Sequence, residues 1–235
     1  MAYEYLIFDA DHTIIDFDAD ERRAFYAAFA AAGIRATADM VEACWAFSAQ
    51  NWGELGLNDV HLPALRDRYH ALYHTHVRAI LSYMDTMYGL GAKKNAAEQA
   101  FSAALGLPAH LVDGALETLT ALEKQYSLCI ATNGIAAIQA GRLSALAPLF
   151  AHVFVSEPMG VIKPDVRFFA HMLDALCVTA DRCLMIGDSL ASDVAGANAV
   201  GMDAVWFNRR GRPLPDGVRV KAVIGDLRAL LPMLL

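Results

Sequence analysis

The chain has 235 residues, more than one average domain and fewer than two large ones, so a core domain with an insertion is expected. Hydrophobic residues make up 56% of the sequence and charged residues 19%, which excludes a largely disordered chain. The formal net charge of -7, with Lys and Arg scattered along the chain, disfavours nucleic acids and anionic membranes as partners. A small anionic substrate stays compatible with that charge, because a metal ion, a lysine or a helix N-terminus can reverse the field locally.

The N-terminal residues include an acid where a secretory signal peptide needs a basic segment, and no later apolar run reaches about 18 residues. We therefore expect a cytoplasmic protein with no membrane partner. The sequence leaves a monomer and a homodimer open.

The first expected element is a short apolar run, 5–8, which stops at Asp9 and predicts a central strand with acids at its carboxyl end. From about residue 20 to residue 105, apolar residues recur at three- and four-residue spacing, as at Phe25 and Phe29, which predicts helices only. We interpret residues 17–105 as an all-helical insertion into a core domain formed by residues 1–16 and 106–235.

After residue 106 the chain alternates strand and helix, as parallel βαβ units do. Strands are expected at 128–131, 153–155, 183–186 and 204–207, helices at 111–124, 135–146, 167–176 and 193–200, and a surface loop at 209–216. The expected fold class is therefore α/β, a doubly wound parallel sheet with an inserted helical domain. Such sheets bind ligands at the carboxyl ends of their strands.

Polar residues follow four of the predicted strands at that edge. They are Asp9 and Asp11, Thr132 and Asn133, Lys163, and Asp188 with Asp193 shortly after it. Each acid alone could be a solvated loop residue or a helix cap, but four carboxylates in one crevice repel one another unless a cation neutralises them. A hard divalent ion with oxygen ligands, Mg²⁺ above all, answers that repulsion.

The carboxylates then take different roles. Asp9, at the strand end, is suited to attack phosphorus and form an aspartyl-phosphate. Asp11, past the bend, can protonate the leaving oxygen and then deprotonate the hydrolytic water, while Thr13 is expected to fix the turn. Asp188 is expected to be a direct metal ligand, and Asp193 to orient metal-bound water or Lys163.

A phosphate site is expected beside these acids. The Thr132 hydroxyl and the backbone amides of Asn133 and Gly134, at a helix start, can donate to a phosphoryl group, although Thr132 can equally cap its helix. Lys163 supplies a point charge for the phosphate and for Asp9, and Pro164 is expected to open the next helix.

Together these segments resemble motifs I to IV of the haloacid dehalogenase superfamily in order, spacing and strand placement. The segments are Asp9-Ala-Asp11-His-Thr13, Thr132-Asn133-Gly134, Lys163-Pro164 and Gly187-Asp188-Ser-Leu-Ala-Ser-Asp193. The resemblance covers residues 3–16 and about 110–208, and it makes the insertion similar to a C1-type cap. It implies a Rossmann-like core, Mg²⁺ held by Asp9, the Asp11 backbone carbonyl and Asp188, and phosphoryl transfer through Asp9.

Within the superfamily, the segments 8–18, 131–134 and 155–164 resemble the bacterial pyrimidine 5'-nucleotidases, although His12 stands where that subgroup often has Glu. This resemblance implies nucleoside monophosphates as substrates, with phosphoglycolate or a sugar phosphate as the alternative. Asp11 argues against dehalogenation, which needs no second acid in this motif. Cleavage of phosphonates by a lysine of the cap is disfavoured because the first lysine is Lys93. A phosphomutase and a non-catalytic binding module stay open.

Two features of the helical insertion have competing interpretations. Trp45, Phe47 and Trp52 can stack on a base or pack an ordinary core. His70 and His74, four residues apart, have a spacing that can bind a transition metal, but their aromatic and aliphatic neighbours favour an amphipathic helix.

Overall fold

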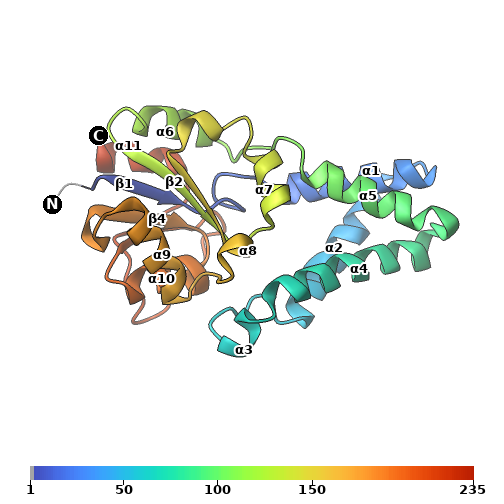
Figure 1. Cartoon of the computed structure of the whole chain (residues 1–235). Coiled ribbons are helices and arrows are strands. Elements are labelled where there is room, and N and C mark those ends of the chain that lie inside the picture. Colours follow the sequence, from blue (N-terminus) through green and yellow to red (C-terminus); the bar gives the residue numbers. More distant parts are fainter. Residues whose placement is uncertain (1–2) are drawn as a thin grey trace. The chain divides into compact units, whose positions relative to one another are not determined.

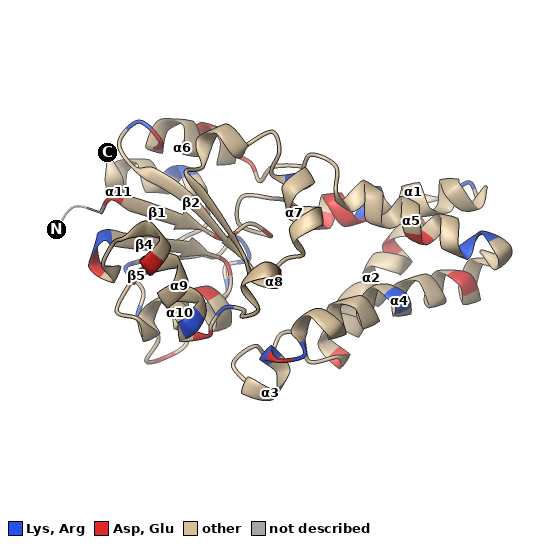
Figure 2. Ribbon diagram, viewed as in Figure 1, with Lys and Arg blue, Asp and Glu red and all other residues tan. Residues whose placement is uncertain are grey.

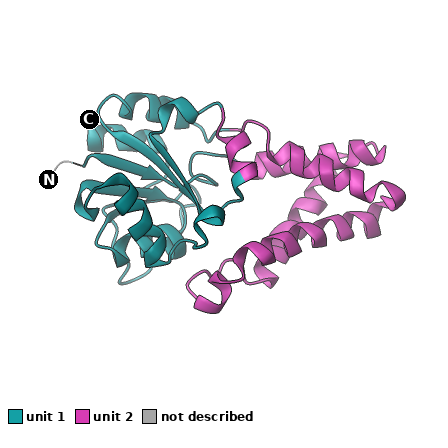
Figure 3. Ribbon diagram, in the orientation of Figure 1, with its two compact units in different colours: residues 1–16, 111–136, 145–235 teal, residues 17–110, 137–144 magenta. Residues whose placement is uncertain are grey.

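The computed structural model describes residues 3–235 and divides them into two compact units (Figure 3). The core unit comprises the N-terminal residues up to Asp16 together with Leu111–Ala136 and Ala145–Leu235. The helical unit comprises Phe17–His110 and also Ala137–Ser144. This last segment lies in the stretch that strand and helix alternation assigned to the core, and the chain therefore passes between the two units four times.

The core unit is built on one sheet of six parallel strands, in the order β3-β2-β1-β4-β5-β6 (Figure 1). The strands are β1 (Tyr5–Phe8), β2 (Ser127–Thr132), β3 (His152–Val155), β4 (Cys183–Gly187), β5 (Asp203–Phe207) and β6 (Ala222–Ile224). This topology confirms the predicted doubly wound sheet. The sequence did not predict β6, because it has only three residues, is half-exposed and forms an edge of the sheet, so it carries no apolar run.

Helices and helical turns fill the connections between these strands and follow the last of them. They are α6 (Ala115–Leu122), α7 (Ala136–Arg142), α8 (Ser156–Met159), α9 (Val166–Leu176), α10 (Ala195–Ala199) and α11 (Leu231–Leu234), with 3-10 turns at Ala147–Leu149, Ala180–Arg182 and Leu227–Leu230. The expectation that Pro164 opens a helix is wrong, since α9 begins at Val166 and Asp165 caps it by accepting from the amide of Arg167. The turn Leu190–Val194 before α10 is a π-helix.

The buried centre of the sheet aligns the carboxyl ends of its strands. Phe8 of β1 stands opposite Ile130 of β2 and Ile186 of β4, so the residues that follow these strands emerge side by side. One face of the sheet packs against α9, whose Phe168 and Phe169 are completely buried. Leu6, Ile7 and Phe8 are all completely buried, so both faces of β1 are covered, and Asp9 comes directly after this buried strand.

The helical unit contains α1 (Phe17–Ala32), α2 (Ala38–Glu54), α3 (Pro63–Arg66), α4 (Tyr69–Tyr88) and α5 (Lys94–Leu105), with a 3-10 turn at Gly91–Lys93. Its fully described span 17–110 contains no strand, as predicted. The periodic residues of α1 are buried against α5, and the rings of Phe25 and Phe101 lie 5.2 Å apart between centroids. Among the helices of residues 3–235, none combines the length and apolar character that a membrane crossing requires. Acidic and basic residues are interspersed over both units (Figure 2).

The three aromatic residues singled out in the insertion all make packing contacts inside the helical unit. The guanidinium of Arg22 lies over Trp45, at 4.2 Å from the ring centroid, and Phe47 stacks on Tyr83 at 4.2 Å. Trp52 meets the His76 ring edge to face at 5.2 Å. These contacts match the ordinary-core interpretation.

A buried polar chain crosses the helical unit from α1 through α2 to α4. Ser48 Oγ donates to Glu21 Oε1 at 2.6 Å and lies 3.2 Å from His76 Nε2. His76 Nδ1 lies 2.9 Å from Asn51 Oδ1. Burial, reinforced by the charge of Asp18, raises the pKa of Glu21 from 4.5 to about 7. Burial likewise lowers the pKa of His76 to about 4.

Replacing Glu21 by Gln should make the protein more stable than the wild type at alkaline pH. The raised pKa means that the folded wild type holds its proton, so the stability contributed by protonated Glu21 is complete below about pH 4.5 and is lost as the pH rises through about 7. Gln keeps an acceptor for Ser48 and never ionises. The gain in unfolding free energy should grow between pH 4.5 and 8 to about 3 kcal/mol, measured by urea unfolding.

Neutral His76 contributes stability that is lost as the pH falls from 6.5 through about 4, the opposite direction to Glu21. The wild type and Glu21→Gln share this contribution, so it cancels when their unfolding free energies are compared. Exposed Glu123 is the matched control, and its change to Gln should leave the pH dependence unaltered. A stability difference between wild type and Glu21→Gln that stays constant from pH 5 to pH 8 would contradict the argument.

Candidate active site

Lys163 stands at the centre of the polar cluster that follows the strand ends. Its side chain is only 1% exposed, and Nζ donates three bonds of 2.6 Å each, to Asp9 Oδ1, Asp193 Oδ1 and the carbonyl oxygen of Ala131. The Asp9 amide donates to the Ile186 carbonyl at 2.8 Å, which ties the end of β1 to β4. Three of the predicted site residues, far apart in the sequence, are thus in direct contact.

The electrostatics of this cluster are dominated by an excess of carboxylates over cations. Burial, with repulsion from Asp193 and Asp188, raises the pKa of Asp9 well above its usual value although the ammonium of Lys163 opposes the shift. Burial and Asp193 likewise raise the pKa of Asp188 to about 6. Burial alone would lower the pKa of Lys163, but Asp193 and Asp9 outweigh it and raise this pKa, so Lys163 stays charged.

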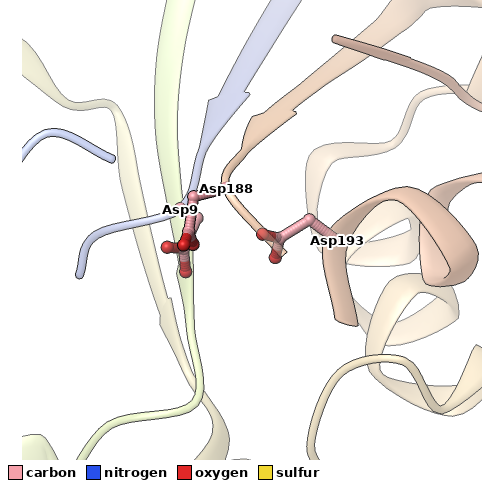
Figure 4. A group of neighbouring side chains, drawn as sticks. All are labelled: Asp9, Asp188 and Asp193. Carbon is pink, nitrogen blue, oxygen red and sulfur yellow. The ribbon is translucent and has the colours of Figure 1, made fainter. Parts of the chain in front are cut away.

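Asp9, Asp188 and Asp193 bring carboxylate oxygens within 4.8 Å of one another (Figure 4). Within residues 3–235, these three acids form a group of side chains whose oxygens lie close enough together to hold one metal ion. Three carboxylates face one ammonium, and the remaining negative charge in a partly desolvated site fits a hard divalent cation with oxygen ligands. The donor set therefore matches Mg²⁺.

Asp193 is engaged through both of its carboxylate oxygens. Oδ1 accepts from Lys163, and Oδ2 accepts from the backbone amide of Ser189 at 3.0 Å. Asp193 thus contacts Lys163 directly, as its predicted role in orienting that lysine requires, and the assignment of Asp9 and Asp188 as the metal ligands stays a prediction. Gly187 allows the arrangement, because a Cβ at that position would collide with the Asp193 carboxylate.

Thr13 does more than fix the turn that follows β1. It is completely buried, and its hydroxyl accepts from the Asp188 amide at 3.1 Å and donates to Asp9 Oδ2 at 3.3 Å. The turn itself places His12 at a φ of 62°, a left-handed conformation that is uncommon for residues other than Gly. A positive charge on His12 opposes the rise in the pKa of Asp188 that burial and Asp193 cause. Asp11 is half-buried in the same turn, and its predicted roles in proton transfer and metal binding stay predictions.

The loop after β2 is joined to the Lys163 segment by the side chain of Asn133. Its Nδ2 donates to the Lys163 carbonyl at 2.9 Å, and its Oδ1 accepts from the Lys163 amide at 2.8 Å. The Gly134 amide donates to Thr132 Oγ1 at 3.2 Å, as in a capping interaction. The expected phosphate contacts of Thr132, Asn133 and Gly134 stay predictions. The pair of hydrogen bonds between the Asn133 side chain and the Lys163 backbone was not predicted.

Two further residues hold the segment that bears Asp188. Trp206 Nε1 donates to the Asp188 carbonyl at 2.9 Å, and Arg212 donates to the same oxygen at 3.2 Å. Arg212 comes from the loop that was expected to be a plain surface loop. No pattern in the sequence marks either contact, because both depend on side-chain reach across the sheet edge.

Comparisons with known proteins agree with this geometry. The family model described as haloacid dehalogenase-like hydrolase matches residues 3–201. The pyrimidine 5'-nucleotidase PynA of Streptococcus pneumoniae is 32% identical over 212 residues, which cover 88% of this chain and 85% of PynA. The pyrimidine 5'-nucleotidase YjjG of Escherichia coli is 32% identical over 52% of this chain and 55% of its own length.

Among solved structures, the HAD hydrolase YfnB of Bacillus subtilis, which was crystallised with bound magnesium, superposes with a TM-score of 0.81. It is 30% identical, and the match covers 100% of this chain and 99% of YfnB. A family match over most of the chain and relatives of 30% identity or more over nearly its full length point to the same group. The chain belongs to the haloacid dehalogenase-like hydrolases.

Proposed function

We propose that this hydrolase removes phosphate from small phosphomonoesters in a Mg²⁺-dependent reaction, with Asp9 as the covalent nucleophile and pyrimidine nucleoside 5'-monophosphates as the leading substrates. The observation that carries the proposal is the buried contact of Asp9 with Lys163, beside the carboxylates of Asp188 and Asp193. The names of PynA and YjjG support the nucleotide as substrate.

The first half of the reaction transfers the phosphoryl group to the protein. A carboxylate oxygen of Asp9 attacks phosphorus, a new P–O bond forms, and the bond from phosphorus to the leaving alcohol oxygen breaks. Asp11 gives its proton to that leaving oxygen. Lys163 holds Asp9 in place through Oδ1 and contributes positive charge next to the developing negative charge.

The second half releases inorganic phosphate. Asp11, now ionised, takes a proton from a water molecule, whose oxygen attacks phosphorus and expels Asp9 as a carboxylate. Both protein groups return to their initial states. A bound Mg²⁺, held by Asp9 and Asp188, would supply further positive charge against the phosphoryl oxygens.

The proposal is tested by phosphate release from a panel of pyrimidine and purine nucleoside monophosphates, sugar phosphates and phosphoglycolate, with Mg²⁺ or with EDTA. We expect turnover only with Mg²⁺ and the highest kcat/KM for a pyrimidine nucleotide. A higher value for a sugar phosphate would overturn the nucleotide assignment but not the phosphatase. Equal release in EDTA would overturn the Mg²⁺ dependence, and absence of release from every compound would overturn the phosphatase itself.

A further inference from the structure

The helix that follows the Thr132–Gly134 loop belongs physically to the helical unit. Residues Ala137–Ser144 group with that unit, whereas the loop residues up to Ala136 group with the core. Ile138 packs against the apolar cluster of α1, α2, α4 and α5. The chain therefore leaves the core unit three residues after Asn133.

Arg142, in the last turn of α7, anchors that helix to α1. Its side chain is 1% exposed, it donates to Asp20 Oδ2 at 3.2 Å, and its guanidinium lies over the ring of Phe17 at 5.1 Å. The Asp20 side chain is completely buried. A buried ion pair of this kind is hard to break, because removal of one partner leaves the other charge desolvated.

The backbone of α7 is held as closely as this side chain. The Ala109 amide donates to the Arg142 carbonyl at 3.1 Å, and Gly141 lies so near the chain at Gly106 that an added Cβ would collide with the Gly106 carbonyl. Gly141 is thus required for the close approach rather than for its backbone freedom. Two independent features therefore fix α7 on the helical unit.

The N-terminal end of α7 adjoins the Thr132–Gly134 loop, which contacts Lys163 beside the candidate nucleophile. The Ala136 amide donates to Glu157 Oε2 at 2.8 Å, and Asn133, three residues earlier, brackets the backbone of Lys163. Lys163 in turn contacts Asp9 at 2.6 Å. The links from Asp20 to Asp9 are the Asp20–Arg142 ion pair, helix α7, the loop from Asn133 to Ala136, and the hydrogen bonds of Asn133 and Lys163.

We infer that Arg142 is a positioning residue for the reaction: by anchoring α7 on the helical unit it holds the Asn133 loop, and through that loop Lys163, in the geometry that Asp9 requires. The inference rests on the proposed function for its effect on turnover, but the effect on the loop can be measured without substrate. If Arg142 contributed only to global stability, its replacement would change neither the turnover nor the hydrogen exchange of the Asn133 loop in the folded protein.

The test compares Arg142→Met with a matched control, Arg23→Met. Arg23 pairs with the same carboxylate, at 3.0 Å from Asp20 Oδ1, and donates to the carbonyls of Ala104 and Pro108 rather than to an atom of α7. We expect kcat for phosphate release to fall about tenfold in Arg142→Met, with KM changed less than kcat, and to stay within about twofold in Arg23→Met. Arg142→Lys should recover part of the loss because it keeps the charge but not the fork geometry.

Amide hydrogen exchange of the folded proteins is the second readout. Residues 133–136 and Lys163 should exchange faster in Arg142→Met than in the wild type or in Arg23→Met. Gly141→Ala, which separates α7 from Gly106 without removing a charge, should reproduce both effects and serves if Arg142→Met does not fold. Should no substrate be turned over by the wild type, the exchange data still decide the inference.

Unchanged exchange and a kcat within twofold of the wild type in Arg142→Met would overturn the inference. Equal losses in Arg142→Met and Arg23→Met would also overturn it, since they would indicate a general loosening of the helical unit.

Discussion

Asp9→Asn should abolish phosphate release, by about four to six orders of magnitude in kcat, since an amide oxygen is a poor nucleophile at phosphorus. The variant should fold, because Asn has nearly the same shape and its single oxygen can still accept from Lys163, while its NH2 group replaces the oxygen that accepted from Thr13. It also removes one of three crowded carboxylates, which relieves repulsion. The measurement is phosphate release in single-turnover and steady-state conditions.

The control for Asp9→Asn is Asp16→Asn, which changes a nearby core acid that faces Arg209 at 3.9 Å, outside the Lys163 cluster. That variant should keep its turnover within about threefold, as a surface ion pair contributes little. Retention of more than about a hundredth of wild-type turnover in Asp9→Asn would rule out Asp9 as nucleophile. If the chain were a binding module, Asp9→Asn would keep its affinity for ligand while the wild type showed no turnover.

Lys163→Met should combine loss of activity with a large loss of stability. The substitution leaves Asp9 and Asp193, both buried, without the ammonium that each contacts at 2.6 Å. Breaking a buried pair in this way typically costs about 3–5 kcal/mol, and two carboxylates share this lysine. We expect a loss of unfolding free energy of that order near pH 8, measured by urea unfolding.

The loss in Lys163→Met should shrink as the pH falls from 8 to 5. Burial and mutual repulsion already raise the pKa of Asp9, and that of Asp188 to about 6, and without the ammonium these carboxyls take up protons more readily. Protonation removes the unpaired charge, so the variant regains stability in acid relative to the wild type. Lys221→Met, at a half-exposed lysine 3.5 Å from Asp203, should change stability by less than about 1 kcal/mol at either pH. Equal stability of Lys163→Met and wild type at pH 8 would contradict the argument.

The sheet and the cluster of site residues were predictable because both follow from patterns local in the sequence. Apolar runs identified five of the six strands, and the shared edge of parallel strands implied that Asp9, Lys163 and Asp188 would meet. The half-exposed strand β6 was missed because it offers no such run.

The remaining features depend on contacts between residues that no local pattern connects. The Thr13 hydroxyl joins Asp9 to the Asp188 amide, which lies 175 positions after Thr13 in the chain. The Asn133 side chain joins two loops 30 residues apart. The assignment of α7 to the helical unit depends on a glycine contact and on the Asp20–Arg142 pair. Periodicity indicates that a segment is helical but does not indicate which neighbour will bury it.

The attachment of α7 also determines how the protein can be rebuilt. Exchanging residues 17–110 for the helical insertion of another hydrolase would remove Asp20. The buried guanidinium of Arg142 would then lack its carboxylate partner. Residues 137–144 would then face a foreign surface just after the loop that brackets Lys163. A chimera intended to change substrate preference should therefore transplant two segments together, the insertion and α7, as one discontinuous module.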